Sequence, residues 1–351
     1  MPTKQEAKNA LDKVISKSRV HLYKPIQIAE ILYRDRVHKD INLDNLEDYR
    51  TKSKKWRDEM CLPLLGRVCT SSAKFQDDLF NDTAIPPSII KILGEENRRT
   101  NGAVEAYIYR LFSNKHNQLS NALNNCLDAT PETFDVKKFI DSFWNEPGLK
   151  RSLDKIYEII VYSLFSTLVS ALNMQVSITV DQDKMSILSD FEDFAQMVMC
   201  IDTTNTTYIQ DARVYRVGVT NAADRGLDMY SNWGPAIQIK HLSLDVELAE
   251  NIVNSVSSDR IVIVCKDAEK AVILSLLNQI GWKSKIQSII TENDLIRWYE
   301  KALRGKYSSI IGKDLLWCLC EEIAEEFPSI DSTPDELKNR HYETILDSFW
   351  K

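Results

Sequence analysis

The segment Asp228-Met-Tyr-Ser-Asn-Trp-Gly-Pro-Ala-Ile-Gln-Ile-Lys-His-Leu242 decides the fold class of this 351-residue chain. Residues 227–230 and 235–242 are predicted as strands, and the side chains of a strand alternate between its two faces. A helix over 245–256 follows, opened by a capping residue, Ser243 or Asp245. The apolar run Ile261-Val-Ile-Val-Cys265 then predicts a strand buried on both faces. Strands and helices alternate, which indicates a sheet covered by helices.

The same alternation of predicted helices and strands extends from residue 149 to about residue 305. Helices are predicted over 149–172, 185–199 and 267–280. Further strands are predicted over 174–180, 214–219 and 285–290. The fold class is therefore α/β, in the form of an α+β mixed sheet with helices on its faces.

The flanking parts of the chain are predicted to be helical. Residues 2–145 read almost entirely as helices, and Pro147-Gly148 interrupts that pattern. The predicted organisation is a large helical N-terminal region over 1–147, the mixed-sheet core over 148–305 and a helical C-terminal tail over 306–351.

Charge is distributed unevenly along the chain. The net charge is −7, but residues 1–120 hold 21 Lys and Arg against 16 Asp and Glu, whereas residues 121–351 hold 23 against 35. The N-terminal third is thus the better candidate for contacting phosphates, although the alternative is a solvated helix face. The basic residues that we consider for DNA contact in this third are Arg50, Lys52, Lys54, Lys55, Arg57, Lys74, Arg98 and Arg99.

Three residues of the opening segment suit metal-dependent phosphodiester cleavage. Asp228 precedes Gln238 and Lys240, which share one strand face. The Asp228 carboxylate, the Gln238 amide and the Ile239 carbonyl offer the hard oxygen ligands that Mg²⁺ prefers, and Lys240 would stabilise negative charge on phosphorus. Such a loose pattern arises by chance about once or twice in a chain of this length. The alternative is therefore a strand with a polar, solvent-exposed face.

Several other functions lack their sequence motifs. The chain has no G-x-x-x-x-G-K-[ST], G-x-G-x-x-G, G-x-S-x-G or H-E-x-x-H, so no nucleotide cofactor is expected. The longest apolar stretch, Ile159–Leu172, is too short for a membrane span, and the charged N-terminus does not read as a signal peptide. The seven cysteines form no C-x-x-C pair, which indicates an intracellular protein.

Four segments resemble one family. They are Arg216–Leu242, which contains the candidate site, Val20-His-Leu-Tyr-Lys-Pro-Ile-Gln-Ile-Ala-Glu-Ile-Leu-Tyr-Arg-Asp-Arg36, Gly148-Leu-Lys-Arg-Ser-Leu-Asp-Lys-Ile-Tyr-Glu158, and Ile280-Gly-Trp-Lys283. All four are similar to the HaeII family of type II restriction endonucleases. The similarity extends over most of the chain, to about residue 306.

The resemblance implies a PD-(D/E)xK nuclease core that cuts double-stranded DNA with Mg²⁺ as a homodimer in the bacterial cytoplasm. It also implies the palindromic target purine-GCGC-pyrimidine. Asp228, Gln238 and Lys240 take the positions of the motif's Asp, its Glu or Asp, and its Lys. Two residues depart from the motif: Leu227 stands in place of Pro, and Gln238 removes one negative charge from the metal site.

The missing charge requires another acid, and Glu158 is our candidate, with Asp224 and Glu247 as alternatives. Arg225 and His241 flank the site and are candidates for phosphate contact. An ordinary structural or surface role is the alternative for each of these residues. With the nuclease core assigned, region 1–147 is expected to bind DNA, 148–305 to be catalytic and 306–351 to serve packing or dimerisation.

Two other functions stay open from the sequence. Gln238 would also fit a catalytically inactive DNA-binding protein built on a nuclease scaffold. A structure-selective repair nuclease, which prefers branched or nicked DNA to an intact palindrome, is the other alternative.

Overall fold

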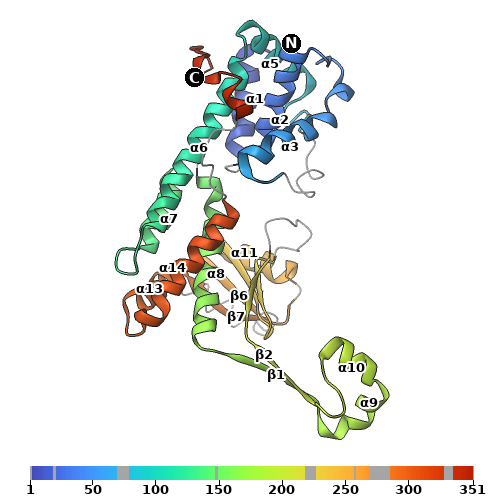
Figure 1. The fold of residues 1–351 in the computed structure, drawn as a ribbon, viewed down its shortest axis with the longest axis vertical. Helices are drawn as coiled ribbons and strands as arrows, with labels where there is room; N and C mark the ends of the chain where they lie inside the picture. Colours follow the sequence, from blue (N-terminus) through green and yellow to red (C-terminus); the bar gives the residue numbers. More distant parts are fainter. Residues whose placement is uncertain are drawn as a thin grey trace.

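The computed structural model describes residues 2–18, 21–68, 79–146, 149–217, 227–256, 258–268, 285–327 and 335–350. Figure 1 shows three parts: a helical body at the top, a sheet-containing core in the middle and an arm that projects from the core at the bottom. None of the helices in these ranges has the length and apolar character that a membrane span requires.

The helical body contains both ends of the described chain (Figure 1). A buried apolar cluster joins its helices, and Leu337, Tyr342 and Trp350 from the C-terminal end belong to the same cluster. Its elements are α1 (Lys4–Lys17), α2 (Tyr23–Tyr33), the π-helix η1 (Arg34–His38), the 3-10 helix η2 (Leu46–Asp48), α3 (Lys52–Leu65), α5 (Pro87–Arg99), α15 (Asp335–Lys338) and the 3-10 helix η5 (Tyr342–Thr344).

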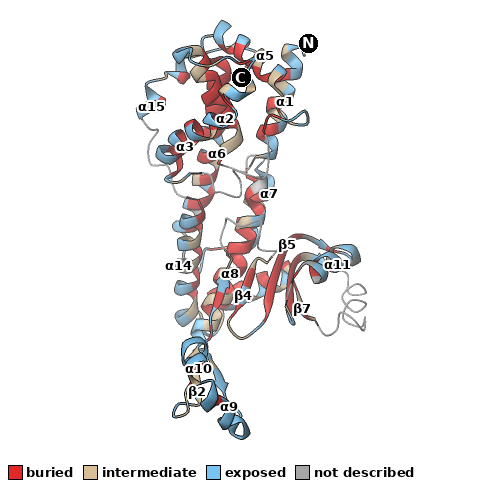
Figure 2. Ribbon diagram, turned by 90° about the vertical axis from the view of Figure 1, so that its right-hand side faces the viewer, coloured by how far each residue is buried: buried red, intermediate tan, exposed pale blue. Residues whose placement is uncertain are grey.

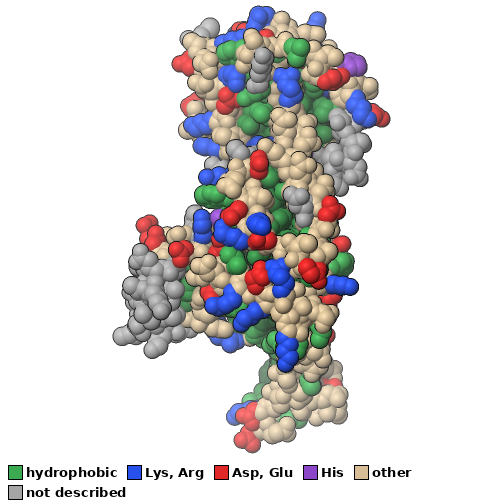
Figure 3. All heavy atoms as spheres, turned by 90° about the vertical axis from the view of Figure 1, so that its left-hand side faces the viewer, with side chains coloured by type: hydrophobic (Ala, Val, Ile, Leu, Met, Phe, Trp, Pro, Cys, Tyr) green, Lys and Arg blue, Asp and Glu red, His purple; other side chains and the backbone are tan. Residues whose placement is uncertain are grey.

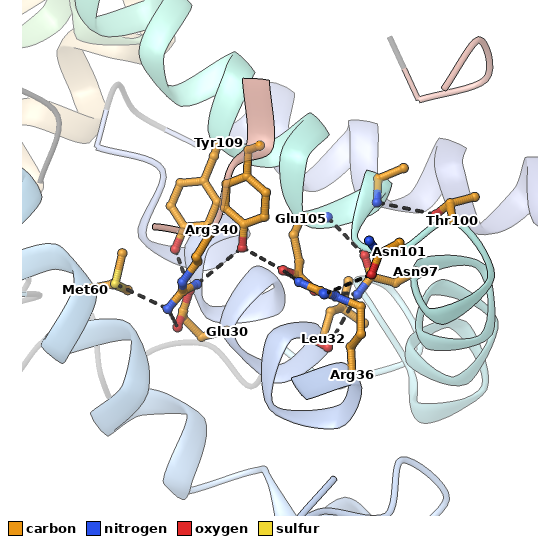
Figure 4. Close-up of polar contacts among 12 residues, drawn as sticks. Glu30, Leu32, Arg36, Met60, Asn97, Thr100, Asn101, Glu105, Tyr109 and Arg340 are labelled. Atoms are coloured by element: carbon orange, nitrogen blue, oxygen red, sulfur yellow. Dashed lines mark hydrogen bonds and ion pairs between the residues drawn. The ribbon is translucent and has the colours of Figure 1, made fainter. Parts of the chain in front are cut away.

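Two buried acids fasten the C-terminal end to this body (Figure 4). Arg340 donates two hydrogen bonds, of 2.6 and 3.0 Å, to the carboxylate of Glu30. Tyr342 donates a hydrogen bond of 2.6 Å to Glu105, which Arg36 also binds at 2.8 and 2.9 Å. Because both carboxylates lie in bidentate pairs with guanidinium groups, their buried charge is compensated.

The predicted tail of residues 306–351 is divided between two parts of the molecule. Helix α14 (Ser308–Glu326) packs on the core, whereas 335–350 returns to the helical body. The apolar face of α14, with Leu315, Leu319 and Ile323, accounts for its position, because it joins the large cluster around the sheet.

The core is built on a five-stranded sheet in the order β3-β4-β5-β6-β7. Neighbouring strands are antiparallel from β3 to β5 and parallel from β5 to β7. This mixed sheet confirms the predicted α/β class. The strands are β3 (Val214–Arg216), β4 (Met229–Ser231), β5 (Ala236–Leu244), β6 (Ile261–Ala268) and β7 (Ile286–Thr291).

Helices cover both faces of this sheet, whose strands are largely buried (Figure 2). On β5, Ile237 and Ile239 join the cluster that contains α8 (Leu153–Ala171), α13 (Glu292–Arg304) and α14. Ala236 and Leu244 join a separate cluster with α11 (Val246–Ser255). Because successive side chains of β5 point to opposite faces of the sheet, this strand contributes to the apolar layer on each face.

One long helix, α6 (Ala103–Leu127), connects the helical body with the core (Figure 1). Its first turns, through Phe112, belong to the apolar cluster of the body, and its last turns, from Leu119, belong to that of the core. Helix α7 (Val136–Asn145) and the 3-10 helix η3 (Lys150–Ser152) then lead into α8. The two bodies are joined through a rigid element of roughly 37 Å.

Residues 172–211 form the arm. It contains the two-stranded antiparallel ladder of β1 (Gln175–Thr179) and β2 (Thr207–Asp211), with η4 (Gln182–Lys184), α9 (Met185–Asp190) and α10 (Glu192–Met199) at its tip. The strand predicted over 174–180 therefore exists but lies outside the mixed sheet. The prediction misplaced it because its partner, Thr207-Tyr-Ile-Gln-Asp211, lacks the apolar run of a buried strand.

Candidate active site

Asp228, Gln238 and Lys240 converge at the junction of β4 and β5. Asp228 directly precedes Met229, which pairs with Ile237, so Asp228 stands beside Gln238. The backbone N–H of Ile239 donates a hydrogen bond of 2.7 Å to Asp228 Oδ2, and the Gln238 amide donates a second one to the same oxygen. Lys240 Nζ lies 3.7 Å from it. The three residues, which are separated in the sequence, thus form a single cluster around the Asp228 carboxylate.

Glu158 of α8 belongs to the same electrostatic environment. Its side chain is buried, and Lys155 Nζ lies 2.5 Å from its Oε2. Burial raises the pKa of Glu158, the nearby charge of Asp228 raises it further, and Lys155 and Arg216 oppose the shift. The pKa of Asp228 is also raised by burial and is lowered in part by Lys240. Two acids and two lysines therefore share this part of the core.

The amide of Gln238 provides a test of whether this site fits a metal ion. Its side-chain oxygen is buried and has no hydrogen-bond partner, although such a group is normally paired in a folded protein. An unpaired amide oxygen next to a carboxylate matches the hard oxygen ligands of Mg²⁺. Among the described residues, no three His, Cys, Asp or Glu side chains gather into a metal site. The oxygen donors that the structure brings together here are the Asp228 carboxylate and the Gln238 amide oxygen.

Arg216 connects this site with helix α14. Its guanidinium group lies 2.9 Å from Glu322 and 3.4 Å from Glu326. The burial of Glu322 raises its pKa, and the charge of Arg216 opposes that shift. Since Arg216 is already paired with two acids, its contribution is to hold β3 against α14.

A cationic group around Trp144 lies at one end of the parallel strands, and no pattern in the sequence predicted it. Lys150 Nζ lies 4.1 Å and Lys266 Nζ 4.5 Å from the centre of the Trp144 ring, which is 42% exposed. Lys266 is on β6, next to Cys265, which pairs with Lys240. The three residues come from separate segments, so only the tertiary fold reveals the group.

His241 is not at the surface. It is buried, with its ring centre 4.9 Å from that of Tyr157 and 5.7 Å from that of Trp144. Its Nε2 lies 3.6 Å from Glu292. In this arrangement the His241 ring packs beside Trp144, and its burial does not suit contact with a phosphate group. Glu247 lies exposed in the first turn of α11, and Asp224 and Arg225 lie outside the described residues.

The basic residues predicted to contact DNA in the helical body divide into two groups. Arg57 is buried and binds Gln27 at 3.1 Å and Asp58 at 2.8 Å, which makes it a structural residue. Arg98 is paired with Asp35, and Arg99 with Glu96. Arg50, Lys52, Lys55, Arg98 and Arg99 are exposed and Lys54 is partly exposed, whereas Lys74 lies outside the described residues.

Known proteins similar to this chain belong to one family. The model of the HaeII restriction endonuclease family matches residues 7–342. The chain is 61% identical to the type II restriction enzyme HaeII of Haemophilus aegyptius over 345 residues, which cover 98% of each chain. It is 54% identical to the type II restriction enzyme NgoBI of Neisseria gonorrhoeae, covering 98% of this chain and 99% of that protein. No solved structure matches the chain.

A family match over nearly the whole length, together with two relatives above half identity, leads to one conclusion: this chain belongs to the HaeII restriction endonuclease family.

Proposed function

We propose that this type II restriction endonuclease hydrolyses phosphodiester bonds of double-stranded DNA with Mg²⁺ held by Asp228, Gln238 and the Ile239 carbonyl. The observation that carries the proposal is the convergence of Asp228, Gln238 and Lys240 around one carboxylate oxygen. The unpaired, buried oxygen of Gln238 supports the assignment of the metal site.

The order of elements supports a PD-(D/E)xK core. Helix α8 precedes an antiparallel meander, β3-β4-β5, and helix α11 then leads to the parallel strand β6. Asp228 precedes the second strand of the meander, and Gln238 and Lys240 lie on the third. This arrangement, with Asp228 directly before one strand and Gln238 and Lys240 on its neighbour, supports the proposed motif.

Each residue of the site has a defined role in the proposed reaction. When bound, Mg²⁺ supplies Lewis acidity at a phosphate oxygen. Lys240 stabilises the negative charge that develops on the phosphorus centre, since its ammonium group is already fixed 3.7 Å from Asp228. Glu158 is the second acid that compensates for the neutral Gln238. Lys155, at 2.5 Å, favours its ionised form.

DNA contact is expected around this centre and on the helical body. Trp144 provides an exposed aromatic ring with the ammonium groups of Lys150 and Lys266 within 4.5 Å of its centre, which suits the sugar-phosphate backbone. The basic residues Arg50, Lys52, Lys54, Lys55, Arg98 and Arg99 are the remaining candidates. Arg57 is engaged inside the body and is no longer proposed as a contact.

The proposed target is the palindrome purine-GCGC-pyrimidine, cut by a homodimer in the bacterial cytoplasm. A palindrome has two-fold symmetry, so two copies of the chain would present one active site to each strand. This part of the proposal rests on the family resemblance.

The test is digestion of a supercoiled plasmid of known sequence. We expect discrete fragments with Mg²⁺ that end at purine-GCGC-pyrimidine sites, and no cleavage with EDTA. Lys240→Ala should abolish cleavage, whereas Lys313→Ala, an exposed lysine of α14, should cut as the wild type does. Uncut plasmid from folded wild-type protein would point to an inactive scaffold, and preferential cutting of branched DNA to a repair nuclease.

A further inference from the structure

Two cysteines from distant parts of the chain meet between helices α6 and α14. Cys126 is on the last turn of α6 and Cys320 is on α14, 194 positions later. Their Sγ atoms lie 3.8 Å apart, and the Cys320 thiol also lies 3.8 Å from the Cys126 carbonyl oxygen. Both are free thiols. Because the sulfur atoms of a disulfide are about 2.0 Å apart, a movement of roughly 2 Å would join them.

The apolar packing of the two helices holds these thiols together. On α6, Leu123 belongs to the apolar cluster of the core and lies three positions before Cys126, on the same side of the helix. On α14, Leu316 belongs to that cluster and lies four positions before Cys320. Each thiol is therefore on the packed side of its helix, and the fold maintains the pair without a covalent bond.

The two thiols differ in their exposure to solvent. Cys320 is partly exposed, whereas the side chain of Cys126 is buried. Figure 3 views the molecule from the side on which α6 and α14 lie in Figure 1, and Lys, Arg, Asp and Glu side chains are spread over the middle of that face. This face is hydrophilic, so small polar molecules in solution have access to it. Cys320 is thus the thiol that an oxidant meets first.

The two thiols also differ in acidity. The hydrogen bond with Cys126 lowers the pKa of Cys320, whereas burial and the charge of Glu321 oppose that shift. The same contact raises the pKa of Cys126, and burial raises it further. A partly exposed thiol with a lowered pKa beside a second thiol is the usual arrangement of a redox-sensing pair. On the same helix, burial raises the pKa of Cys318, which makes that thiol a matched comparison.

We propose that Cys320 and Cys126 form an oxidation site, at which a hydroperoxide converts the two thiols into a disulfide between α14 and α6. The Cys320 thiolate attacks one peroxide oxygen, the O–O bond breaks, and Cys320 becomes a sulfenic acid. Cys126 then attacks the Cys320 sulfur, the S–S bond forms, and the sulfenic oxygen leaves as water. With hydrogen peroxide, the two thiols lose two electrons, and the products are one disulfide and two water molecules.

The disulfide would restrict movement between the helical body and the core. Helix α6 connects these two parts, and the backbone carbonyl of Glu326, at the end of α14, accepts a hydrogen bond from Arg67 of the body. A covalent link between α6 and α14 would therefore fasten the connecting helix to a second element that contacts both parts. This inference goes beyond the proposed function and does not depend on it.

Peptide mapping of the full chain tests the proposal. Reduced protein is treated with hydrogen peroxide, digested without reductant and analysed by mass spectrometry. The wild type should give a linked peptide pair containing Cys126 and Cys320 that dithiothreitol separates, and oxidation should raise its unfolding midpoint by about 5 °C or more. The matched control, Cys318→Ser on the same helix, should form the same link, whereas Cys320→Ser should not form it.

The variant Cys126→Ser separates the two steps of the reaction. Oxidation of Cys320 should then stop at the sulfenic acid, which dimedone traps as an adduct visible in the same mass spectra. If the loss of the buried Cys126 thiol unfolds the protein, Cys320→Ser retains the test, because that position is partly exposed. A wild type in which the exposed Cys200 is oxidised while Cys126 and Cys320 both stay reduced would overturn the proposal. A disulfide from either thiol to another cysteine would overturn it as well.

Discussion

The helical body and the core both bury charged side chains, but they compensate them differently. In the body, Glu30 and Glu105 are each bound by an arginine at two positions and by a tyrosine hydroxyl (Figure 4). In the core, burial raises the pKa values of Asp228 and Glu158, and the oxygen of Gln238 has no partner.

This difference separates a structural polar cluster from a functional one. A bidentate guanidinium group satisfies a buried carboxylate and fixes two segments relative to each other. The charge of the core carboxylates is only partly balanced by neighbouring groups, so binding of a cation would stabilise their ionised forms. The comparison predicts that substitutions in the body change stability and that substitutions in the core change activity.

The largest effect is expected for Asp228→Ala. Cleavage should fall at least about 10³-fold, because several kcal/mol of charge stabilisation in the transition state are lost with the metal. The unfolding midpoint should stay close to that of the wild type. Asp314→Ala, an exposed acid of α14, is the control. Cleavage rates from single-turnover assays check this prediction, and a variant that retains a tenth of the activity would refute it.

In the body, Arg340→Ala should destabilise the fold by about 3–5 kcal/mol, since it leaves Glu30 buried without its cation. Denaturant unfolding measures this loss. The exposed pair Arg297–Asp294, at 2.7 Å, provides the control, and Arg297→Ala should cost no more than about 1 kcal/mol. Activity per folded molecule should be unchanged in both. A specific loss of cleavage in Arg340→Ala would contradict a purely structural role for this arginine.

Gln238→Glu would restore the negative charge that is missing from the core site. The Mg²⁺ concentration for half-maximal cleavage should fall about tenfold, because an added anionic ligand strengthens binding of a hard cation. Gln287→Glu, on the exposed side of β7, should not change it. A Mg²⁺ titration that gives the same midpoint for Gln238→Glu and the wild type would argue against Gln238 as a ligand.

The raised pKa of Glu158 makes the stability of the metal-free protein depend on pH. Because the folded-state pKa lies above that of the unfolded chain, native protein holds the proton more tightly. Stability from this group is present at low pH and is lost as the pH rises through the folded pKa. Glu158→Gln should therefore raise the melting temperature at pH 7 but not at pH 4. Equal differences at both pH values would contradict the assignment.

The smallest effect is expected at the cationic group around Trp144. Lys266→Ala should weaken DNA binding a few-fold and reduce the slope of log K against log salt by about 1, as for the loss of one phosphate contact. Lys306→Ala serves as the control, because this lysine lies over the ring of Tyr307, outside the proposed site. Binding measured without Mg²⁺ at several salt concentrations distinguishes the two.

The sequence predicted the local part of this site and missed the long-range part. The alternation from Ala236 to Lys240 identifies a strand, and family similarity identifies Asp228 as its partner. The role of Arg57 was wrongly predicted, because its partner Gln27 is 30 positions away and nothing in the basic run indicates that it is buried. For the same reason Lys155, Trp144 and Lys266 were missed: their proximity is created by packing of α7, α8 and β6.

The most direct measurement is anomalous diffraction from crystals of the whole protein soaked with Mn²⁺. We expect a strong peak within coordination distance of the Asp228 carboxylate and the Gln238 amide oxygen, absent from crystals of Asp228→Ala. Crystals with no peak there, or with an equal peak after that substitution, would contradict the claim that these two side chains hold the catalytic ion.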